Sequence, residues 1–358
     1  MQIQNKRIVW LDTCRALAIS LVILTHATDQ IFIKYLYGDS TTTLFTSIIM
    51  YTFFTLGRLG VPIFLFITGS LLLKRNYLEK DNTIKFFRNN FLPLFLSTIF
   101  WIFAYNLFDL LILKKEISLK NIILELLLLK RNDMPHMWYM YMILGLYLAI
   151  PFIATIVNHF PKKIVIAIGI LPLIYSMILP SIIQINNLCG INCSLSPIID
   201  LSFLGGCYGV YCVTGYYISN NFQNKIKPVS IALAGISFGV ITIFLQAFAY
   251  QTGNKFNVWY DFILLYLSAV CLMLLISKIS MKNEKLISLL TFVSKRSLAL
   301  YFVHMPVRFI LIKYIPFSTL NAKFATPVFF ISIYCVSLLF IVALERIPFI
   351  RKWVFLIK

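Results

Sequence analysis

Apolar runs of about twenty residues recur along this chain of 358 residues, and they constrain its fold more than any other feature. A helix needs about 20 apolar residues to cross the hydrocarbon core of a bilayer. The sequence predicts ten such helices, near residues 8–33, 44–73, 86–113, 137–157, 164–183, 198–218, 229–250, 259–276, 297–315 and 325–344. With 60% hydrophobic and 13% charged residues, a soluble core cannot hold this much apolar surface. We therefore expect an all-α, polytopic integral membrane protein.

The basic residues indicate the orientation of the chain. The net charge is +19, but the Lys and Arg side chains stand at the ends of the apolar runs and form no basic stripe typical of nucleic-acid binding. If the N-terminus is cytoplasmic, 20 of the 32 basic residues fall on the inner side. Cytoplasmic loops carry such an excess. Both termini are thus predicted to be cytoplasmic, and one membrane domain, residues 1–358, is expected to fill the chain without a soluble appended domain.

Two polar residues in the first run point to a functional site. Arg15 and His26 lie inside an apolar segment, where charge is costly unless it has a function. Eleven helical residues advance ~16.5 Å and turn through three turns plus ~20°, so both side chains share one helix face at two depths. Asp12 precedes Arg15 by three residues and is placed to pair with it. The alternatives are a structural ion pair for Arg15 and a hydrogen bond to a neighbouring helix for His26.

The second run is too long for one straight span. Gly57, Gly60 and Pro62 surround Arg58, so a broken helix with free backbone groups is expected there. Arg58 is a candidate for stabilising an oxyanion or binding a phosphate, and the alternative is a snorkelling or carbonyl-capping arginine.

Further candidates lie in the fourth and ninth runs. Ser297, Tyr301 and His304 are spaced to share one helix face, and Arg308 follows one turn later with no assigned role. They are candidates for a catalytic or an interhelical hydrogen-bonding role. His136 and Trp138 stand at the predicted outer entrance of the fourth run, where either a sugar-stacking site or a plain aromatic belt would fit.

The cysteines show no metal-binding spacing, and no metal is expected. Five of the seven lie in the apolar runs, where a small buried side chain is the usual role. Cys189 and Cys193 lie in a loop predicted to be outside the membrane, where they could form a disulfide or remain free thiols.

Four stretches, in order along the chain, resemble the membrane acyltransferase-3 family. They are Leu11-Asp12-x-x-Arg15 with His26, Arg58 through Thr68-Gly69, His136-Met137-Trp138-Tyr139 through Pro151, and Ser297 through His304. Thr68-Gly69 replaces a Ser-Gly pair that is usual in relatives. The likeness runs nearly end to end.

This resemblance implies a surface-glycan O-acyltransferase of the bacterial inner membrane. Its donor would be cytoplasmic acyl-CoA, acetyl-CoA by default, and its acceptor a hydroxyl of a glycan or lipid-linked saccharide. Arg15 would anchor the donor, His26 would act as general base, and Asp12, Ser297, Tyr301 and His304 would bind or orient the donor. The sequence leaves two other classes open. One is a transporter or flippase of lipid-linked sugars, although no inverted repeat is visible. The other is a pH-sensing or purely structural membrane protein, which would not need the other three stretches.

Overall fold

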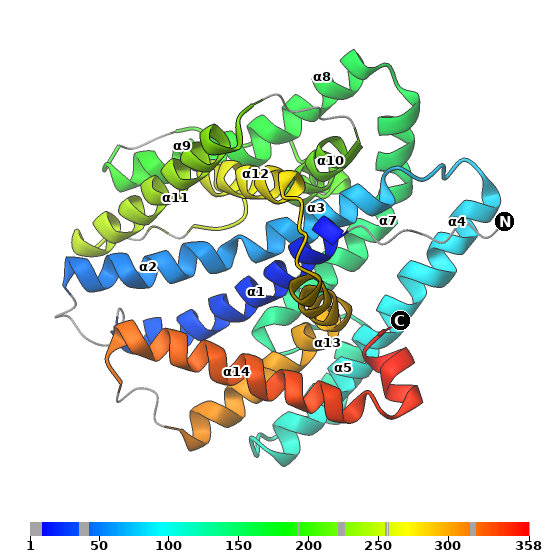
Figure 1. The fold of residues 1–358 in the computed structure, drawn as a ribbon, viewed down its shortest axis with the longest axis vertical. Helices are drawn as coiled ribbons and strands as arrows, with labels where there is room; N and C mark the ends of the chain where they lie inside the picture. The colour runs from blue at the N-terminus through cyan, green and yellow to red at the C-terminus, as the bar shows by residue number, and fades with distance from the viewer. Residues whose placement is uncertain are drawn as a thin grey trace.

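The computed structural model describes residues 9–35, 43–191, 194–220, 226–254, 256, 258–315 and 320–357, and these residues contain helices and loops but no strand. The expected all-α class is confirmed. The helices are α1 Val9–Tyr35, α2 Leu44–Arg58, α3 Gly60–Leu72, α4 Lys80–Phe86, η1 Phe87–Phe91, α5 Leu92–Leu111, α6 Leu119–Leu126, η2 Pro135–Met137, α7 Trp138–His159, α8 Lys162–Leu173, η3 Ile174–Ile178, α9 Leu179–Leu188, η4 Ser202–Leu204, α10 Gly206–Asn220, α11 Pro228–Gln251, α12 Ile263–Lys278, α13 Glu284–Tyr314, α14 Ala322–Leu344 and η6 Ile350–Val354 (Figure 1).

Eight helical segments within the described residues are long and apolar enough to cross a membrane. Two of the ten predicted spans are shorter than expected. The run predicted at 198–218 becomes α-helical only as α10 from Gly206, after the short 3-10 helix η4 and the left-handed Gly205. The run predicted at 259–276 becomes α12, with 16 residues. The polytopic architecture is therefore confirmed, with α10 and α12 as the two short members of the bundle.

The predicted break in the second run is present. α2 ends at Arg58 and α3 begins at Gly60, with Leu59 between them. Pro62 has no N–H and cannot donate to the carbonyl of Arg58, which interrupts the helical ladder at this point. The break places Arg58 at the end of a helix, about 21 Å along the axis from the start of α2.

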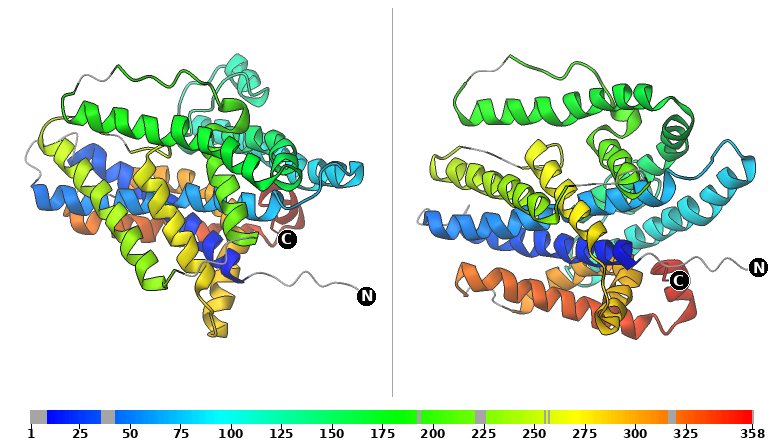
Figure 2. Two further views of the ribbon diagram at one scale, coloured as in Figure 1. Left: turned by 90° about the horizontal axis from the view of Figure 1, so that it is seen from above. Right: turned by 45° about the horizontal axis from the view of Figure 1, so that its top comes forward.

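α1 lies at the centre of the bundle. It packs against α2, α3, α13 and α14. The right-hand view of Figure 2 shows α8 and α9 on one side of α1 and α2, and α14 on the other. Two glycines allow α1 to approach α2 and α3 closely: a Cβ on Gly57 would lie 2.5 Å from the hydroxyl of Thr25, and one on Gly60 would lie 2.6 Å from the carbonyl of Ala18. Small residues allow helix backbones to meet in this way. The segment that carries His26 is thus fixed against α2 and α3.

A second backbone contact joins α3 and α10. A Cβ on Gly69 would lie 1.7 Å from the carbonyl of Cys212, and one on Gly215 would lie 2.1 Å from the carbonyl of Phe66. The Ser70 hydroxyl donates to the carbonyl of Gly215 at 2.8 Å. This contact fixes α10 against α3, the second of the two helices formed by the broken run.

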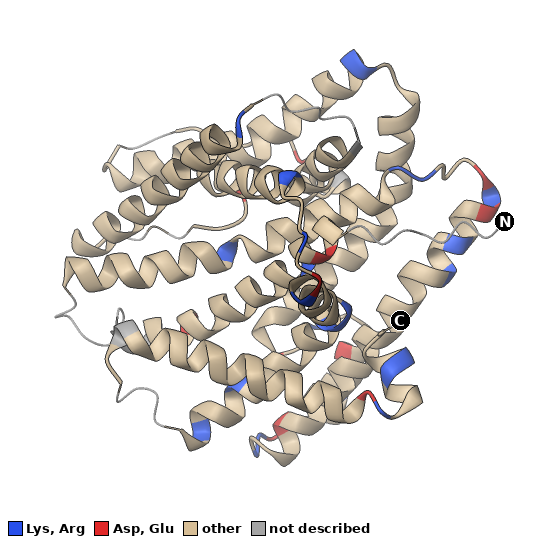
Figure 3. Ribbon diagram, in the orientation of Figure 1, with Lys and Arg blue, Asp and Glu red and all other residues tan. Residues whose placement is uncertain are grey.

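Charged residues divide unevenly between the two ends of the bundle. Lys and Arg gather mainly on the side where α1 begins and α14 ends (Figure 3). This is the side that the sequence assigns to the cytoplasm, and the distribution agrees with the positive-inside pattern.

Candidate active site

Three histidines from three segments form one cluster. The ring of His304 in α13 lies 5.2 Å, centroid to centroid, from the rings of both His26 in α1 and His136 in η2, and the latter two rings are 6.4 Å apart. His136 and His304 are buried, whereas His26 is partly exposed. We call these three residues the histidine cluster. It brings together candidates that the sequence placed in three separate motifs.

Hydrogen bonds fix the two buried rings of the cluster. The Tyr105 hydroxyl donates to the carbonyl of Phe302 at 2.8 Å, so it accepts from His136 Nε2 at 3.0 Å. His304 Nδ1 donates to the carbonyl of Leu300 at 3.0 Å. These assignments leave His136 Nδ1 and His304 Nε2 as buried acceptors, and neither has a hydrogen-bond partner in the described structure. His136 is almost completely buried, which differs from the exposed side chains of a plain interfacial belt.

His26 has a carboxylate partner that the sequence analysis missed. Its Nδ1 lies 3.5 Å from Oδ2 of Asp29, three residues later on the same helix. A carboxylate beside an imidazole fixes the tautomer and stabilises the protonated ring. With the proton of the neutral ring on Nδ1, Nε2 is the nitrogen that can accept a proton from a substrate. The i,i+3 spacing was the signal available in the sequence.

Two arginines flank His26. Arg308 donates from Nε to the carbonyl of His26 at 3.0 Å and from Nη2 to the side chain of Gln30 at 2.7 Å. These two bonds join α13 to the α1 backbone at His26. The positive charges of Arg58 and Arg308 both act on the His26–Asp29 pair.

Arg58 lies in an aromatic cradle. Its guanidinium sits 4.4 Å from the ring of Trp259 and 4.6 Å from that of Phe54, and its Nη1 donates to the Tyr260 hydroxyl at 3.4 Å. Its Nε is buried and has no hydrogen-bond partner in the described part of the chain. Trp138 is half-buried and stacks on Tyr260 with centroids 5.4 Å apart, so it belongs to the surroundings of Arg58.

Arg15 pairs with Asp12 as the spacing predicts, at 3.4 Å between Nη1 and Oδ1. Ser294 of α13 joins the pair: its hydroxyl donates to Asp12 at 2.7 Å and lies 3.3 Å from Nη1 of Arg15. Because this serine is more than 270 residues away in the chain, only the fold reveals it.

Arg15 lines a cavity of about 330 Å³. We call it the Arg15 cavity. Two predicted residues, Ser297 and Tyr301, line it with Arg15, and sequence reasoning missed its other polar members, which are Thr68, Arg75, Asn90, Tyr139 and Tyr147. Arg75 donates to Asn90 at 2.9 Å at the end of α3.

Tyr301 joins the Arg15 cavity to the histidine cluster. It lines the cavity, its hydroxyl donates to the carbonyl of His136, and its ring lies 5.0 Å from the His136 ring. The cavity therefore reaches from the arginines Arg15 and Arg75 to the wall of the histidine cluster.

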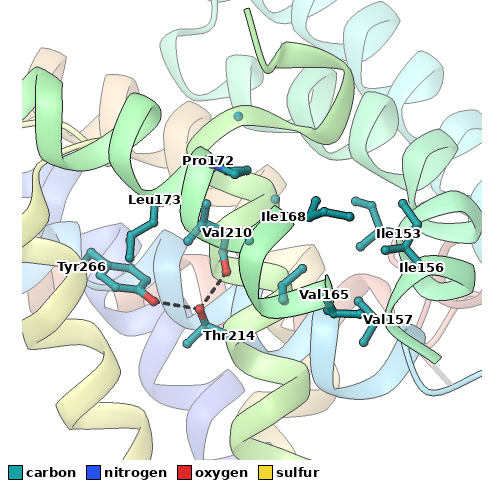
Figure 4. Close-up of a pocket in the computed structure, with 14 residues that line it drawn as sticks. Ile153, Ile156, Val157, Val165, Ile168, Pro172, Leu173, Val210, Thr214 and Tyr266 are labelled. Carbon is teal, nitrogen blue, oxygen red and sulfur yellow. Dashed lines mark hydrogen bonds between the residues drawn. The ribbon is translucent and has the colours of Figure 1, made fainter. Parts of the chain in front are cut away.

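A second cavity lies apart from these residues. It measures about 160 Å³ and is lined mainly by aliphatic side chains of α7, α8 and α10 (Figure 4). Its polar feature is a hydrogen bond of 2.8 Å between the hydroxyls of Thr214 and Tyr266. It contains none of the predicted site residues.

The predicted Cys189–Cys193 disulfide and the expected absence of a metal both stay predictions. Cys189 is exposed, but Cys193 lies outside the described residues, so their disulfide stays a prediction. Within the described ranges, no group of three or more His, Cys, Asp or Glu side chains is arranged to hold a metal ion.

The fold and the site together define a polytopic membrane protein in which a cluster of three histidines lies next to Tyr301 in the wall of a cavity that contains two arginines. A family model described as an acyltransferase domain matches residues 8–346. The chain belongs to this family, acyltransferase-3, and is a membrane acyltransferase by family. No curated protein and no solved structure matches it.

Proposed function

We propose that this protein transfers a small acyl group, acetyl by default, from cytoplasmic acyl-CoA to a hydroxyl of a cell-surface or lipid-linked glycan in the bacterial inner membrane. The observation that carries the proposal is the Arg15 cavity, which has arginines at one end and Tyr301 beside the histidine cluster at the other. In the four stretches quoted above, the sequence also resembles the O-acetyltransferase of enterobacterial common antigen, and we propose a glycan acceptor of that general kind.

The cavity suits a long donor with its charges at one end. Coenzyme A carries phosphates at one end and its thioester at the end of an extended arm. Arg15 and Arg75 would bind phosphate or the polar groups of the arm, since guanidinium groups offer a fixed fork of donors. His26 lies ~16.5 Å further along α1 than Arg15, toward the predicted outer side, where the thioester would meet the acceptor.

Acyl transfer to a hydroxyl needs a base to accept the hydroxyl proton and a positive group to stabilise the negative charge that develops on the thioester oxygen. As the acceptor hydroxyl attacks the thioester carbonyl, its proton passes to Nε2 of His26, and Asp29 stabilises the imidazolium. The carbon–sulfur bond then breaks, and the coenzyme A thiolate takes up the proton from His26. Arg58 would stabilise the developing oxyanion or hold the acceptor beside Trp138.

Direct transfer needs no covalent enzyme intermediate, and we favour it for that reason. An acyl-histidine trapped after incubation with donor alone would instead establish His26 as a nucleophile.

Thermal unfolding of the purified, detergent-solubilised protein tests the donor. A ligand that binds only the folded state raises the unfolding midpoint by mass action. We expect a dose-dependent rise with acetyl-CoA and desulfo-coenzyme A that Arg15→Ala removes and Arg131→Ala, an exposed arginine outside the cavity, retains. No rise in a folded sample would favour the transporter or flippase reading.

A further inference from the structure

A second polar cavity opens beside the N-terminal half of α13. It measures about 350 Å³ and lies between α13 and the segment that follows α14. Its lining shares no residue with the Arg15 cavity, and consists of Ser288, Thr291, Phe292, Lys295, Arg296, Glu345, Arg351 and Ile357. We call it the basic pocket.

The charges of the basic pocket do not cancel. Arg296 is neutralised by Glu345 through two hydrogen bonds of 2.9 and 2.5 Å. Lys295 and Arg351 have no ion-pair partner among the described residues and are exposed. Two positive charges therefore remain beside the hydroxyls of Ser288 and Thr291, a combination of donors that suits a phosphate group.

The walls of the pocket are fixed. The guanidinium of Arg296 stacks on the ring of Phe292 at 3.6 Å, which holds it on α13. The carbonyl of Val354, in η6, accepts hydrogen bonds from the Ser97 hydroxyl at 2.9 Å and from Trp101 Nε1 at 3.3 Å. The C-terminal wall is thus attached to α5, and the site is preformed.

Apolar side chains stand next to the charges. Ile347, Phe349 and Trp353 are exposed by 48%, 62% and 45%, in the segment that also carries Arg351 and Lys352. Exposed aromatic residues beside basic ones are typical of a segment that lies at the membrane–water boundary. The pocket also lies on the side that the sequence assigns to the cytoplasm.

We propose that the basic pocket binds the phosphate of an anionic phospholipid in the inner leaflet, with Lys295 and Arg351 as its charged ligands and the Ser288 and Thr291 hydroxyls as donors. The exposed aromatic side chains would lie among the neighbouring lipids. Basic pockets between membrane helices on the cytoplasmic side recognise lipid headgroups in this way. The site is independent of the acyl-transfer proposal.

Lipid titration of the purified full-length protein tests this site. Phosphatidylglycerol and phosphatidylcholine would be added to the detergent-solubilised protein, with the unfolding midpoint and native mass spectrometry as readouts. The test variant is Lys295→Gln with Arg351→Gln. The control is Lys162→Gln with Lys163→Gln, which removes the same charge from exposed positions in α8, outside the pocket lining. Inorganic phosphate and coenzyme A are run as separate arms.

We expect phosphatidylglycerol, but not phosphatidylcholine, to raise the midpoint and to remain bound in the spectrometer. Each basic residue near an anionic headgroup changes affinity about fivefold, so the test variant should bind about 25-fold more weakly while the control binds like the wild type. Equal binding of both lipids, or equal loss in test and control variants, would overturn the proposal. Stabilisation by phosphate or coenzyme A that only the test variant loses would show that the ligand is a soluble phosphate, and would overturn the lipid assignment. If the test variant does not fold, the proposal is tested by the preference of the wild type between the two lipids and by lipid binding to the single variants Lys295→Gln and Arg351→Gln.

Discussion

Replacing Asp29 by Asn tests whether His26 works as an imidazole–carboxylate pair. The two groups are 3.5 Å apart, where unit charges interact by about 5 kcal/mol at an effective dielectric constant near 20 and about 1 kcal/mol in bulk water. The Asp29 side chain is 37% exposed, so solvent screens much of this energy, and about 2 kcal/mol is expected. Loss of that stabilisation from the transition state should lower kcat about 30-fold.

The assay measures release of the coenzyme A thiol and incorporation of labelled acetyl into glycan in native membranes. Asp29→Glu should recover part of the rate, and Asp133→Asn, at an exposed carboxyl outside the site, should keep the wild-type rate. The donor-dependent rise in unfolding midpoint should be unchanged in Asp29→Asn, because Asp29 lies outside the Arg15 cavity. A kcat within about threefold of wild type for Asp29→Asn would refute the pairing.

Three further predictions concern the site and its framework. His26→Ala should abolish acyl transfer while acetyl-CoA still raises the unfolding midpoint; acyl transfer at the wild-type rate would remove its role as base. Ser294→Ala should raise KM for acetyl-CoA and lower the free energy of unfolding by about 1 kcal/mol, because its hydroxyl supports the ion pair of α1; an unchanged KM would limit Ser294 to folding. Gly69→Ala should prevent stable folding, because the new Cβ would lie 1.7 Å from the carbonyl of Cys212, whereas Gly145→Ala, with nothing within 4 Å, should express and unfold normally in fluorescence size-exclusion and melting measurements.

The framework of the bundle could be predicted from local sequence, and the exceptions have local causes. Run length and hydropathy predict where the long helices lie, and the cluster of Gly57, Gly60 and Pro62 predicts the break. The start of α10 was placed too early, because residues 198–205 are mostly apolar but form a loop and the short 3-10 helix η4. Hydropathy measures how apolar a segment is, and it does not register the left-handed Gly205 that separates this stretch from the helix.

The candidate site could be predicted only where its contacts lie on one helix. Asp12 with Arg15 follows from i,i+3 spacing, and the same rule would have found Asp29 beside His26. The bonds of Ser294 to Asp12 and of Tyr105 to His136 join distant helices, and no periodicity in one segment encodes them. Whether His136 faced the membrane boundary or the interior depended on how η2 meets α5 and α13, which is a property of packing.

A single helix of 31 residues, α13, contributes to the basic pocket, the Arg15 cavity and the histidine cluster. Its first half forms a wall of the basic pocket, its middle lines the Arg15 cavity through Ser297 and Tyr301, and its next turns contribute His304 to the cluster and Arg308 to the carbonyl of His26. Because one continuous helix supplies residues to both cavities, a displacement of α13 on the N-terminal side of Pro306 would change the shape of the basic pocket and of the Arg15 cavity together.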